Sequence, residues 1–281
     1  MALLLFLSGL CVGSFLNVVI DRLPRGEDVI RGRSYCPQCG HTLRWCDLIP
    51  FLSFVLLRGR CRYCGQKISW QYPLVELTTG ILFALPTIQQ FNNLTIPIIL
   101  NSLFLIPIFV IDLKHGIIPD KLVFPGIVVV LGYRLSGVVW RIWSLYSNLR
   151  GDVEGLGPYL LKTNFFRYHA WLELRSLLLT LLGSFVLYSL FFILHSLFRG
   201  RALGGGDVKL AFLVGLIAGW PNMVVAIFSS FLTGALVSVI FMVVGKKSFG
   251  DTIPLGPFLV IGTYIALFWG NNILGWYLKL F

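Results

Sequence analysis

Apolar residues in this chain of 281 residues gather into long runs that are separated by shorter polar stretches. An apolar run of about 20 residues is long enough to cross the hydrocarbon core of a bilayer as a helix. The runs expected to do so are residues 2–20, 74–91, 97–113, 121–139, 176–198, 208–223, 224–245 and 257–278. The sixth and seventh are divided at Trp220-Pro-Asn222. The pattern predicts an all-α polytopic membrane protein with about eight transmembrane helices.

The composition agrees with this pattern, since 57% of the residues are hydrophobic, 12% are charged and the mean hydropathy is +0.83. Such values lie outside the range of ordinary soluble domains. The first run has no positively charged start and no small-residue cleavage site, so we expect a retained helix rather than a signal peptide. The predicted organisation is a first transmembrane helix (1–20), a cytoplasmic cysteine-containing domain (21–73) and a transmembrane bundle (74–281).

The net charge of +11 comes mainly from Lys and Arg residues in the predicted loops. Sixteen of the 23 Lys and Arg residues lie in one set of alternating loops, and six lie in the other. Loops rich in Lys and Arg stay in the cytoplasm, so the first set is predicted to be cytoplasmic. Residues 140–175 would then form the longest loop on the far side. Because the basic residues are dispersed over several loops, no nucleic-acid partner is expected.

Two copies of one local pattern stand in the loop at 21–73: Cys36-Pro-Gln-Cys39-Gly and Cys61-Arg-Tyr-Cys64-Gly. Each turn directs two thiolates at one ion, and two such turns make a tetrahedral four-cysteine zinc site. Two disulfides or a redox pair are the alternatives, but disulfides are rare in the cytosol. No ligand position is left open, so the zinc is predicted to be structural and to hold together a loop too small for its own core. The remaining candidates, Cys11, Cys46 and His41, are interpreted as packing or bystander residues.

Two aspartates lie at the ends of predicted spans, Asp112 at the end of the third and Asp207 at the start of the sixth. A carboxylate at a membrane boundary loses hydration, and a pair of carboxylates can share a proton for acid–base chemistry. The charge pattern places both helix ends at the cytoplasmic face. Asp112 sits at a helix C-terminus, where the helix dipole disfavours negative charge, and the glycines at 204–206 allow close backbone approach. The two aspartates therefore predict an intramembrane aspartic peptidase.

Each aspartate also has a structural interpretation. Asp207 could simply cap a helix, which is a preferred place for Asp, and Asp112 could mark the water boundary. Asp120 competes with Asp112 for the catalytic role, although its place before the fourth span is typical of a helix N-cap. Glu76, at the start of the second span, is a weaker site candidate. The sequence has no His-Glu-x-x-His motif and no Ser-His-Asp arrangement, which argues against zinc and serine peptidase mechanisms.

Several segments in combination resemble the bacterial type IV prepilin peptidases over nearly the whole chain. They are Gly13-Ser-Phe-Leu-Asn-Val-Val-Ile-Asp-Arg-Leu-Pro24, the four-cysteine loop with Asp47-Leu-Ile-Pro50, Ile111-Asp112 with Ile118-Pro-Asp120, the Gly-x-Gly-Asp element at 204–207, and Ile253-Pro-Leu-Gly-Pro-Phe-Leu259. Two positions depart from the family pattern. Cys46 replaces an expected aromatic residue, and the 140–175 loop is long.

The resemblance implies an aspartic endopeptidase of the bacterial inner (cytoplasmic) membrane, with its active site facing the cytoplasm. Members of the family remove the short basic leader of prepilins and pseudopilins. Members with the cysteine loop commonly also N-methylate the new N-terminus with S-adenosylmethionine. By motif match the catalytic pair is Asp112 and Asp207. The methyltransferase activity rests on the resemblance alone, since no Gly-rich nucleotide loop follows a strand.

Two other functions remain open. The chain could be a polytopic transporter with a zinc-stabilised cytosolic loop, in which the aspartates form a proton relay. A relay would place carboxylates at mid-bilayer, whereas these are predicted at one face. A non-enzymatic assembly factor for a secretion machine is the third possibility. Loss of leader cleavage on changing either aspartate would reject both.

Overall fold

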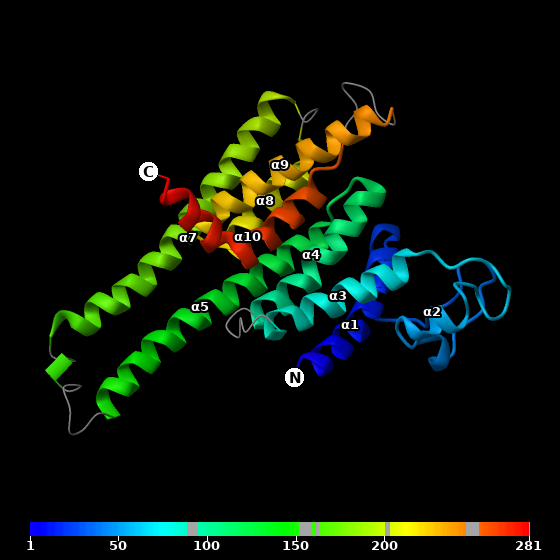
Figure 1. The fold of residues 1–281 in the computed structure, drawn as a ribbon, viewed down its shortest axis with the longest axis horizontal. Helices are drawn as coiled ribbons and strands as arrows, with labels where there is room; N and C mark the ends of the chain where they lie inside the picture. Colours follow the sequence, from blue (N-terminus) through cyan, green and yellow to red (C-terminus); the bar gives the residue numbers. More distant parts are fainter. Residues whose placement is uncertain (89–94, 152–158, 161–162, 200–202, 246–252, 281) are drawn as a thin grey trace. The chain divides into compact units, whose positions relative to one another are not determined.

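The computed structural model describes residues 1–88, 95–151, 159–160, 163–199, 203–245 and 253–280 (Figure 1). The chain separates into two compact units, residues 1–119 and 120–281. Within the described ranges every regular element is a helix, apart from two isolated β-bridges. The predicted all-α class is therefore confirmed. The division of the sequence into residues 1–20, 21–73 and 74–281 stays a prediction.

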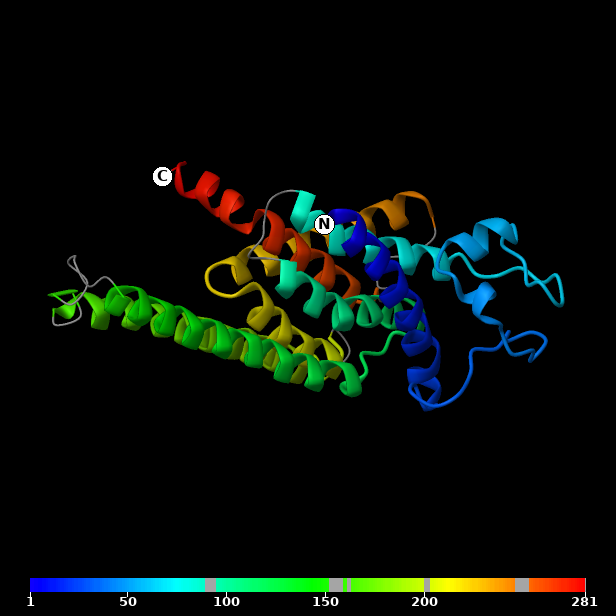
Figure 2. The same ribbon diagram turned by 90° about the horizontal axis from the view of Figure 1, so that it is seen from below.

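Three long helices are formed by the described residues of the first unit. They are α1 (Ala2–Arg22), α3 (Gln71–Ile88) and α4 (Thr95–His115). The segment between α1 and α3 is an extended loop that carries only short helical turns: η1 (Leu23–Arg25), η2 (Trp45–Leu48) and α2 (Leu52–Leu56). In Figures 1 and 2 this loop extends beyond the ends of α1 and α3, which lie side by side.

Glycines allow α1 and α3 to pack unusually closely. A Cβ atom on Gly9 would lie 2.7 Å from the Cα of Gly80, and one on Gly13 would lie 2.7 Å from the Cα of Glu76. Small residues spaced four apart let helix backbones approach in membranes, where packing rather than the hydrophobic effect holds helices together. Gly13 of the first motif thus sets the distance between the two helices.

The described residues of the second unit form five long helices. They are α5 (Asp120–Gly151), α7 (Asn164–Leu197), α8 (Gly205–Ala218), α9 (Asn222–Val243) and α10 (Gly256–Leu278). From Val208 to Ala218 every residue of α8 is buried except Lys209 and Phe212. α8 packs against the other four helices and forms the centre of the unit.

Six helices among the described residues are long and apolar enough to span a membrane. The two other predicted spans are also helical, as α3 and α8, but they do not meet that condition. α8 has 14 residues and is about 21 Å long at 1.5 Å per residue, which is shorter than a hydrocarbon core of about 30 Å. The predicted break at Trp220-Pro-Asn222 is confirmed, because α8 ends at Ala218 and α9 begins at Asn222.

The prediction that residues 140–175 form a loop is wrong. α5 continues to Gly151 and α7 begins at Asn164, so most of this segment is helical (Figure 2). Hydropathy falls after residue 139, but residues 138–150 contain neither Pro nor Gly, so nothing ends the helix there. Residues 152–158 and 161–162 of the predicted loop lie outside the described residues.

Both long helices exceed the length needed to cross a bilayer. α5 has 32 residues, which corresponds to about 48 Å. The C-terminal part of α5 contacts the N-terminal part of α7. There, Arg141 Nε donates a hydrogen bond to Glu173 Oε2 at 2.7 Å. The rings of Tyr146 and Phe166 also meet there, with centroids 6.0 Å apart. The C-terminal part of α5 and the N-terminal part of α7 therefore pack against each other within residues 140–175.

Candidate functional site

The four predicted cysteine ligands lie together in the first unit. The Sγ atoms of Cys36, Cys39, Cys61 and Cys64 are all within 4.8 Å of one another, and those of Cys36 and Cys64 are 4.0 Å apart. Four sulfurs bonded to one tetrahedral zinc at about 2.3 Å would be about 3.8 Å apart. The arrangement is suited to a single metal ion. Cys46 is outside this group, as expected.

The two cysteine turns have the same backbone structure. In each, the glycine after the second cysteine, Gly40 or Gly65, has a positive φ of 68° or 70°, which favours glycine. Each turn is also flanked by an isolated β-bridge. The backbone bonds run from Cys36 N–H to His41 O, Gly40 N–H to Cys36 O, Cys61 N–H to Gln66 O and Gly65 N–H to Cys61 O, at 2.8 to 3.0 Å. The repeated sequence pattern therefore folds into a repeated structure.

Asp47 connects the two halves of the cysteine loop. Its Oδ1 accepts a hydrogen bond from Arg62 Nε at 2.7 Å, and its Oδ2 accepts from the Tyr63 hydroxyl at 3.0 Å and from the Arg44 N–H at 3.2 Å. Burial raises the pKa of Asp47, but these hydrogen bonds outweigh it and hold the pKa below its usual value. Asp47 is therefore a charged crosslink next to the metal-binding group, a role that the sequence analysis did not predict.

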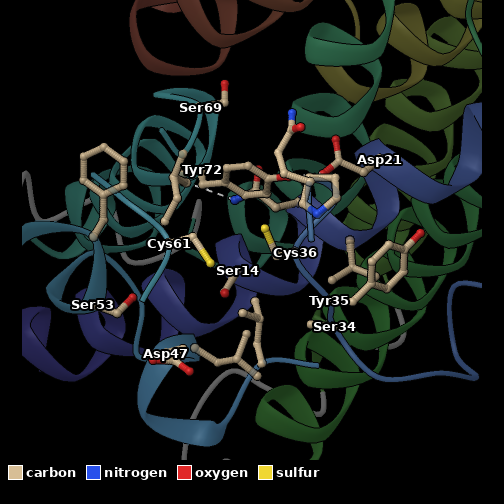
Figure 3. A pocket seen from close by; sticks show the side chains of 18 of the residues that line it. Ser14, Asp21, Ser34, Tyr35, Cys36, Asp47, Ser53, Cys61, Ser69 and Tyr72 are labelled. Carbon is tan, nitrogen blue, oxygen red and sulfur yellow. Dashed lines mark hydrogen bonds between the residues drawn. The ribbon is translucent and has the colours of Figure 1, made fainter. Parts of the chain in front are cut away.

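A cavity of about 650 Å³ lies between the cysteine loop and the helices of the first unit (Figure 3). Figure 3 shows Asp21 and Tyr72 at the cavity together with Cys36 and Cys61. Lys114, near the end of α4, also lines it. The cavity thus adjoins the metal-binding group and is bordered by helices that the sequence assigns to the membrane.

A hydrogen-bond network occupies the helix side of the cavity. The Tyr72 hydroxyl donates to Asp21 Oδ2 at 2.7 Å, and Gln71 Nε2 donates to Asp21 Oδ1 at 3.4 Å and to Asn17 Oδ1 at 3.3 Å. Asn17 Nδ2 in turn donates to the Tyr72 carbonyl at 3.1 Å. Burial, together with the bond to Asp21, raises the pKa of Tyr72, so its hydroxyl stays neutral. The Asp21 carboxylate is thus held in one orientation.

Glu76 in α3 is the second helix residue whose carboxylate lines the cavity. It is 7% exposed, and its Oε2 accepts a hydrogen bond from the Phe51 N–H at 2.7 Å. Phe51 has a φ of 59°, in the left-handed region that non-glycine residues rarely adopt. The bond therefore ties the cysteine loop to α3 at a strained position. From the sequence, Glu76 is predicted only as a weaker candidate for the catalytic site.

The predicted catalytic aspartates both lie at helix ends. Asp112 is 4% exposed in the last turn of α4, where the Gly116 N–H donates to its carbonyl at 2.9 Å. Asp207 is the third residue of α8, and its Oδ2 accepts a hydrogen bond from the Gly204 N–H at 3.1 Å. This hydrogen bond is the helix-capping contact that the structural interpretation of Asp207 predicts. Asp112 belongs to the first unit and Asp207 to the second, and their pairing stays a prediction.

Asp120, the competitor of Asp112, forms an ion pair. Both of its carboxylate oxygens accept from Lys209 Nζ, at 2.7 and 2.8 Å, and this ammonium also lies 5.5 Å from the centre of the Phe124 ring. The pair joins the first residue of α5 to α8, within the second unit. This contact favours a structural role for Asp120.

Comparison with known proteins places these elements in a family. Residues 7–90 match the bacterial peptidase A24 N-terminal domain, and residues 155–239 match the type IV leader peptidase family. The prepilin leader peptidase/N-methyltransferase of Aeromonas hydrophila is 31% identical over 303 residues, which cover 99% of this chain and 94% of the relative. The chain belongs to the type IV leader peptidase family. The resemblance found in the sequence is thereby confirmed.

Other relatives carry the same name. That of Pseudomonas aeruginosa is 31% identical, covering 97% of this chain and 92% of the relative. That of Myxococcus xanthus is 34% identical over 244 residues, and the match spans 63% of that longer protein. No solved structure shows a significant match to the chain.

The two family matches fall on different units of this leader peptidase family member. The N-terminal match covers most of α1, the cysteine loop and α3, and so includes Asp21, Glu76 and all four cysteines. The second match contains α8 and Asp207. The cavity and the Gly-x-Gly-Asp element thus belong to separately recognised parts of the family.

Proposed function

We propose that the chain is a membrane endopeptidase that cleaves the N-terminal leader of type IV prepilins and pseudopilins and then N-methylates the new N-terminus. The observation that carries this proposal is the similarity to relatives named prepilin leader peptidase/N-methyltransferase over more than nine-tenths of their length. The transporter alternative is not favoured by any of these relatives.

In this proposal Asp112 and Asp207 form the catalytic pair. One ionised carboxylate takes a proton from water as the water oxygen attacks the scissile carbonyl carbon. The other carboxyl group is protonated and donates to the carbonyl oxygen, as two neighbouring carboxyl groups that share a proton can do. The burial of Asp112 and the ion pair of Asp120 with Lys209 support Asp112 as the partner.

The proposed setting is the bacterial inner membrane, with the catalytic aspartates at the cytoplasmic face. The distribution of Lys and Arg over the loops supports this orientation. The proposed partners are prepilin or pseudopilin substrates and the lipid bilayer, without nucleic acid. Zinc, bound by the four clustered cysteines, is proposed as a structural ion because four thiolates complete its tetrahedral coordination.

S-adenosylmethionine is the proposed methyl donor. It supplies a methyl group on a positively charged sulfur, from which a nucleophilic amine can take it. The side chains that line the cavity of the first unit fit such a molecule, because they include carboxylates as well as apolar groups. Asp21 and Glu76 are the residues in position to hold a cationic ligand there.

The test is to incubate the purified protein in detergent with a prepilin and the methyl donor, and to measure the mass of the product. We expect loss of the leader and the gain of one methyl group. Asp112→Asn and Asp207→Asn should each abolish cleavage, whereas the matched control Asp120→Asn should retain it. Full activity of Asp112→Asn together with loss in Asp120→Asn would reassign the pair, and no cleavage by the wild type would reject the peptidase.

A further inference from the structure

His195 is a polar side chain near the end of α7 that has no role in the function proposed above. α7 ends at Leu197 and α8 begins at Gly205, so His195 lies close to the connection between the two helices. Its Nδ1 is 2.6 Å from the carbonyl oxygen of Leu203. A carbonyl oxygen only accepts hydrogen bonds, so Nδ1 carries a hydrogen and donates it. The histidine therefore binds the backbone directly in front of α8.

The carbonyl that His195 binds belongs to the same peptide group as the N–H of Gly204. In a trans peptide the C=O and the N–H point in opposite directions within one rigid plane. His195 contacts the carbonyl end of this group, and the N–H end donates to Asp207 Oδ2 at 3.1 Å. A single peptide group thus connects the imidazole of His195 to the carboxylate of Asp207.

The ring of His195 also lies beside the first residue of α8. A Cβ atom on Gly205 would be 3.9 Å from the Cε1 of His195, which is an ordinary van der Waals distance. The backbone at this point consists of three consecutive glycines, residues 204–206, and glycine has the widest conformational freedom of all residues. A side chain that binds this backbone from α7 restricts that freedom where α8 begins.

The contact of His195 has a consequence for the carboxylate at the other end of the peptide group. Hydrogen bonds in a chain polarise one another, so donation to the Leu203 carbonyl makes the Gly204 N–H a stronger donor. A stronger and better-oriented N–H holds the Asp207 carboxylate more firmly in one orientation. Catalysis depends on such orientation, because small displacements of a reacting group lower the rate.

We propose that His195 is a positioning residue for Asp207, which it orients by holding the Leu203–Gly204 peptide group through its Nδ1–H. In this role the imidazole exchanges no proton with the substrate and needs only one donor. The inference rests on the proposed peptidase activity, with Asp207 in the catalytic pair. The structural alternative is that the bond only closes the connection between α7 and α8.

The test is the steady-state rate of leader removal by the purified full chain in detergent, measured with three variants of His195. His195→Asn keeps the donor in place, because the amide nitrogen of asparagine is bonded to Cγ as Nδ1 is. His195→Gln has its amide nitrogen one bond further out, at the position of Nε2, and His195→Leu has no donor.

We expect His195→Asn to retain a kcat within about twofold of the wild-type value. His195→Gln and His195→Leu should lower kcat by about 3- to 10-fold, the net contribution of one hydrogen bond. KM should stay unchanged, because the lost contact acts on the catalytic carboxylate and not on substrate binding.

His169→Leu is the matched control, because His169 lies in the same helix but near its opposite end, where its ring contacts Phe165 and Tyr168. Its kcat should equal that of the wild type. The melting temperature is measured on every variant. His195→Asn and His195→Gln should melt alike, since both keep an amide side chain in the last turn of α7, so a difference in kcat between them reports the donor and not the stability.

The outcomes separate this inference from the proposed function. Retained kcat in His195→Asn with lowered kcat in His195→Gln and His195→Leu supports the positioning role. Equal kcat in all three variants, or a loss that follows the melting temperature, would show that the bond only closes the connection, and the inference would be wrong while the peptidase stands. No cleavage by the wild type, or full cleavage by Asp207→Asn, would instead reject the proposed function.

Discussion

The two units of this protein are ordered by different interactions. In the first unit, the loop between α1 and α3 contains no helix longer than the five residues of α2, and charged or metal-binding side chains hold it together. In the second unit, helices pack around α8, whose interior-facing residues are aliphatic. The stability of the first unit should therefore depend on metal and pH, and that of the second on close packing.

The difference reflects what each segment can bury. The loop is too short to form its own apolar core, and small domains of this kind depend on metal ions or other crosslinks. A buried helix such as α8 satisfies its own backbone hydrogen bonds and needs only complementary neighbours. Changes of one kind should thus affect one unit and spare the other.

Removal of the metal site should have the largest effect. Structural zinc contributes about 10–16 kcal/mol of apparent binding free energy in zinc-finger peptides, so Cys36→Ser should lose the ion and unfold the loop. We expect metal content and melting temperature to fall together, and limited proteolysis to cut within residues 21–73 but not within α8.

Cys46→Ser is the matched control, because Cys46 lies in the same loop but outside the cysteine group. It should keep one zinc per chain and the wild-type melting temperature. A metal-free protein with unchanged stability would show that the first unit does not depend on the ion, and the comparison between the units would fail at its main point.

A packing change in the second unit should have a smaller effect. A Cβ atom on Gly215 of α8 would lie 2.9 Å from the Cα of Ser184 in α7, so Gly215→Ala forces two helices apart. Overpacking of this kind costs about 1–3 kcal/mol, which thermal unfolding can detect. Gly132→Ala is the control, since a Cβ there meets nothing within 4 Å. Equal melting temperatures of the two variants would mean that α8 is not tightly packed.

Much of the fold and of the metal-binding group could be predicted because the signals are local. Long apolar runs identify the helices, and a Cys-x-x-Cys-Gly turn specifies two ligands by itself. The helical ends of α5 and α7 were missed because hydropathy reports burial in lipid rather than helix formation. Arg141 and Trp140 lower the hydropathy there without interrupting the backbone.

The cavity could not be predicted because its contacts join distant positions. Asp21 and Tyr72 are 51 residues apart, and Phe51 and Glu76 are 25 apart. No local pattern indicates that these side chains meet. The same holds for the ion pair of Asp120 with Lys209, whose residues are 89 positions apart. The pairing of Asp112 with Asp207 is also of this long-range kind and stays a prediction.

The smallest expected effect concerns the pH dependence of the first unit. The pKa of Asp47 in the folded chain lies below the usual value of 3.8, because hydrogen bonds from Arg44, Tyr63 and Arg62 stabilise the ionised carboxylate more than burial destabilises it. A lowered pKa contributes stability that is present above the unfolded value and is lost as the pH falls through the folded value. The asparagine in Asp47→Asn does not ionise, so the stability of this variant contains no such pH-dependent contribution.

The stability difference between the wild type and Asp47→Asn should therefore be constant between about pH 7 and pH 5 and should shrink below about pH 4. Proteolysis of residues 21–73 measures this difference at each pH, and comparing the two proteins cancels the loss of metal that acid causes in both. Tyr63→Phe removes one of the three stabilising contacts, so the folded-state pKa moves closer to the unfolded value. The decrease should begin at the same pH as in the wild type, but it should be smaller and end at a slightly higher pH. A difference that stays constant at low pH would show that Asp47 acts through its shape and not its charge, because only an ionised carboxylate changes its contribution on protonation.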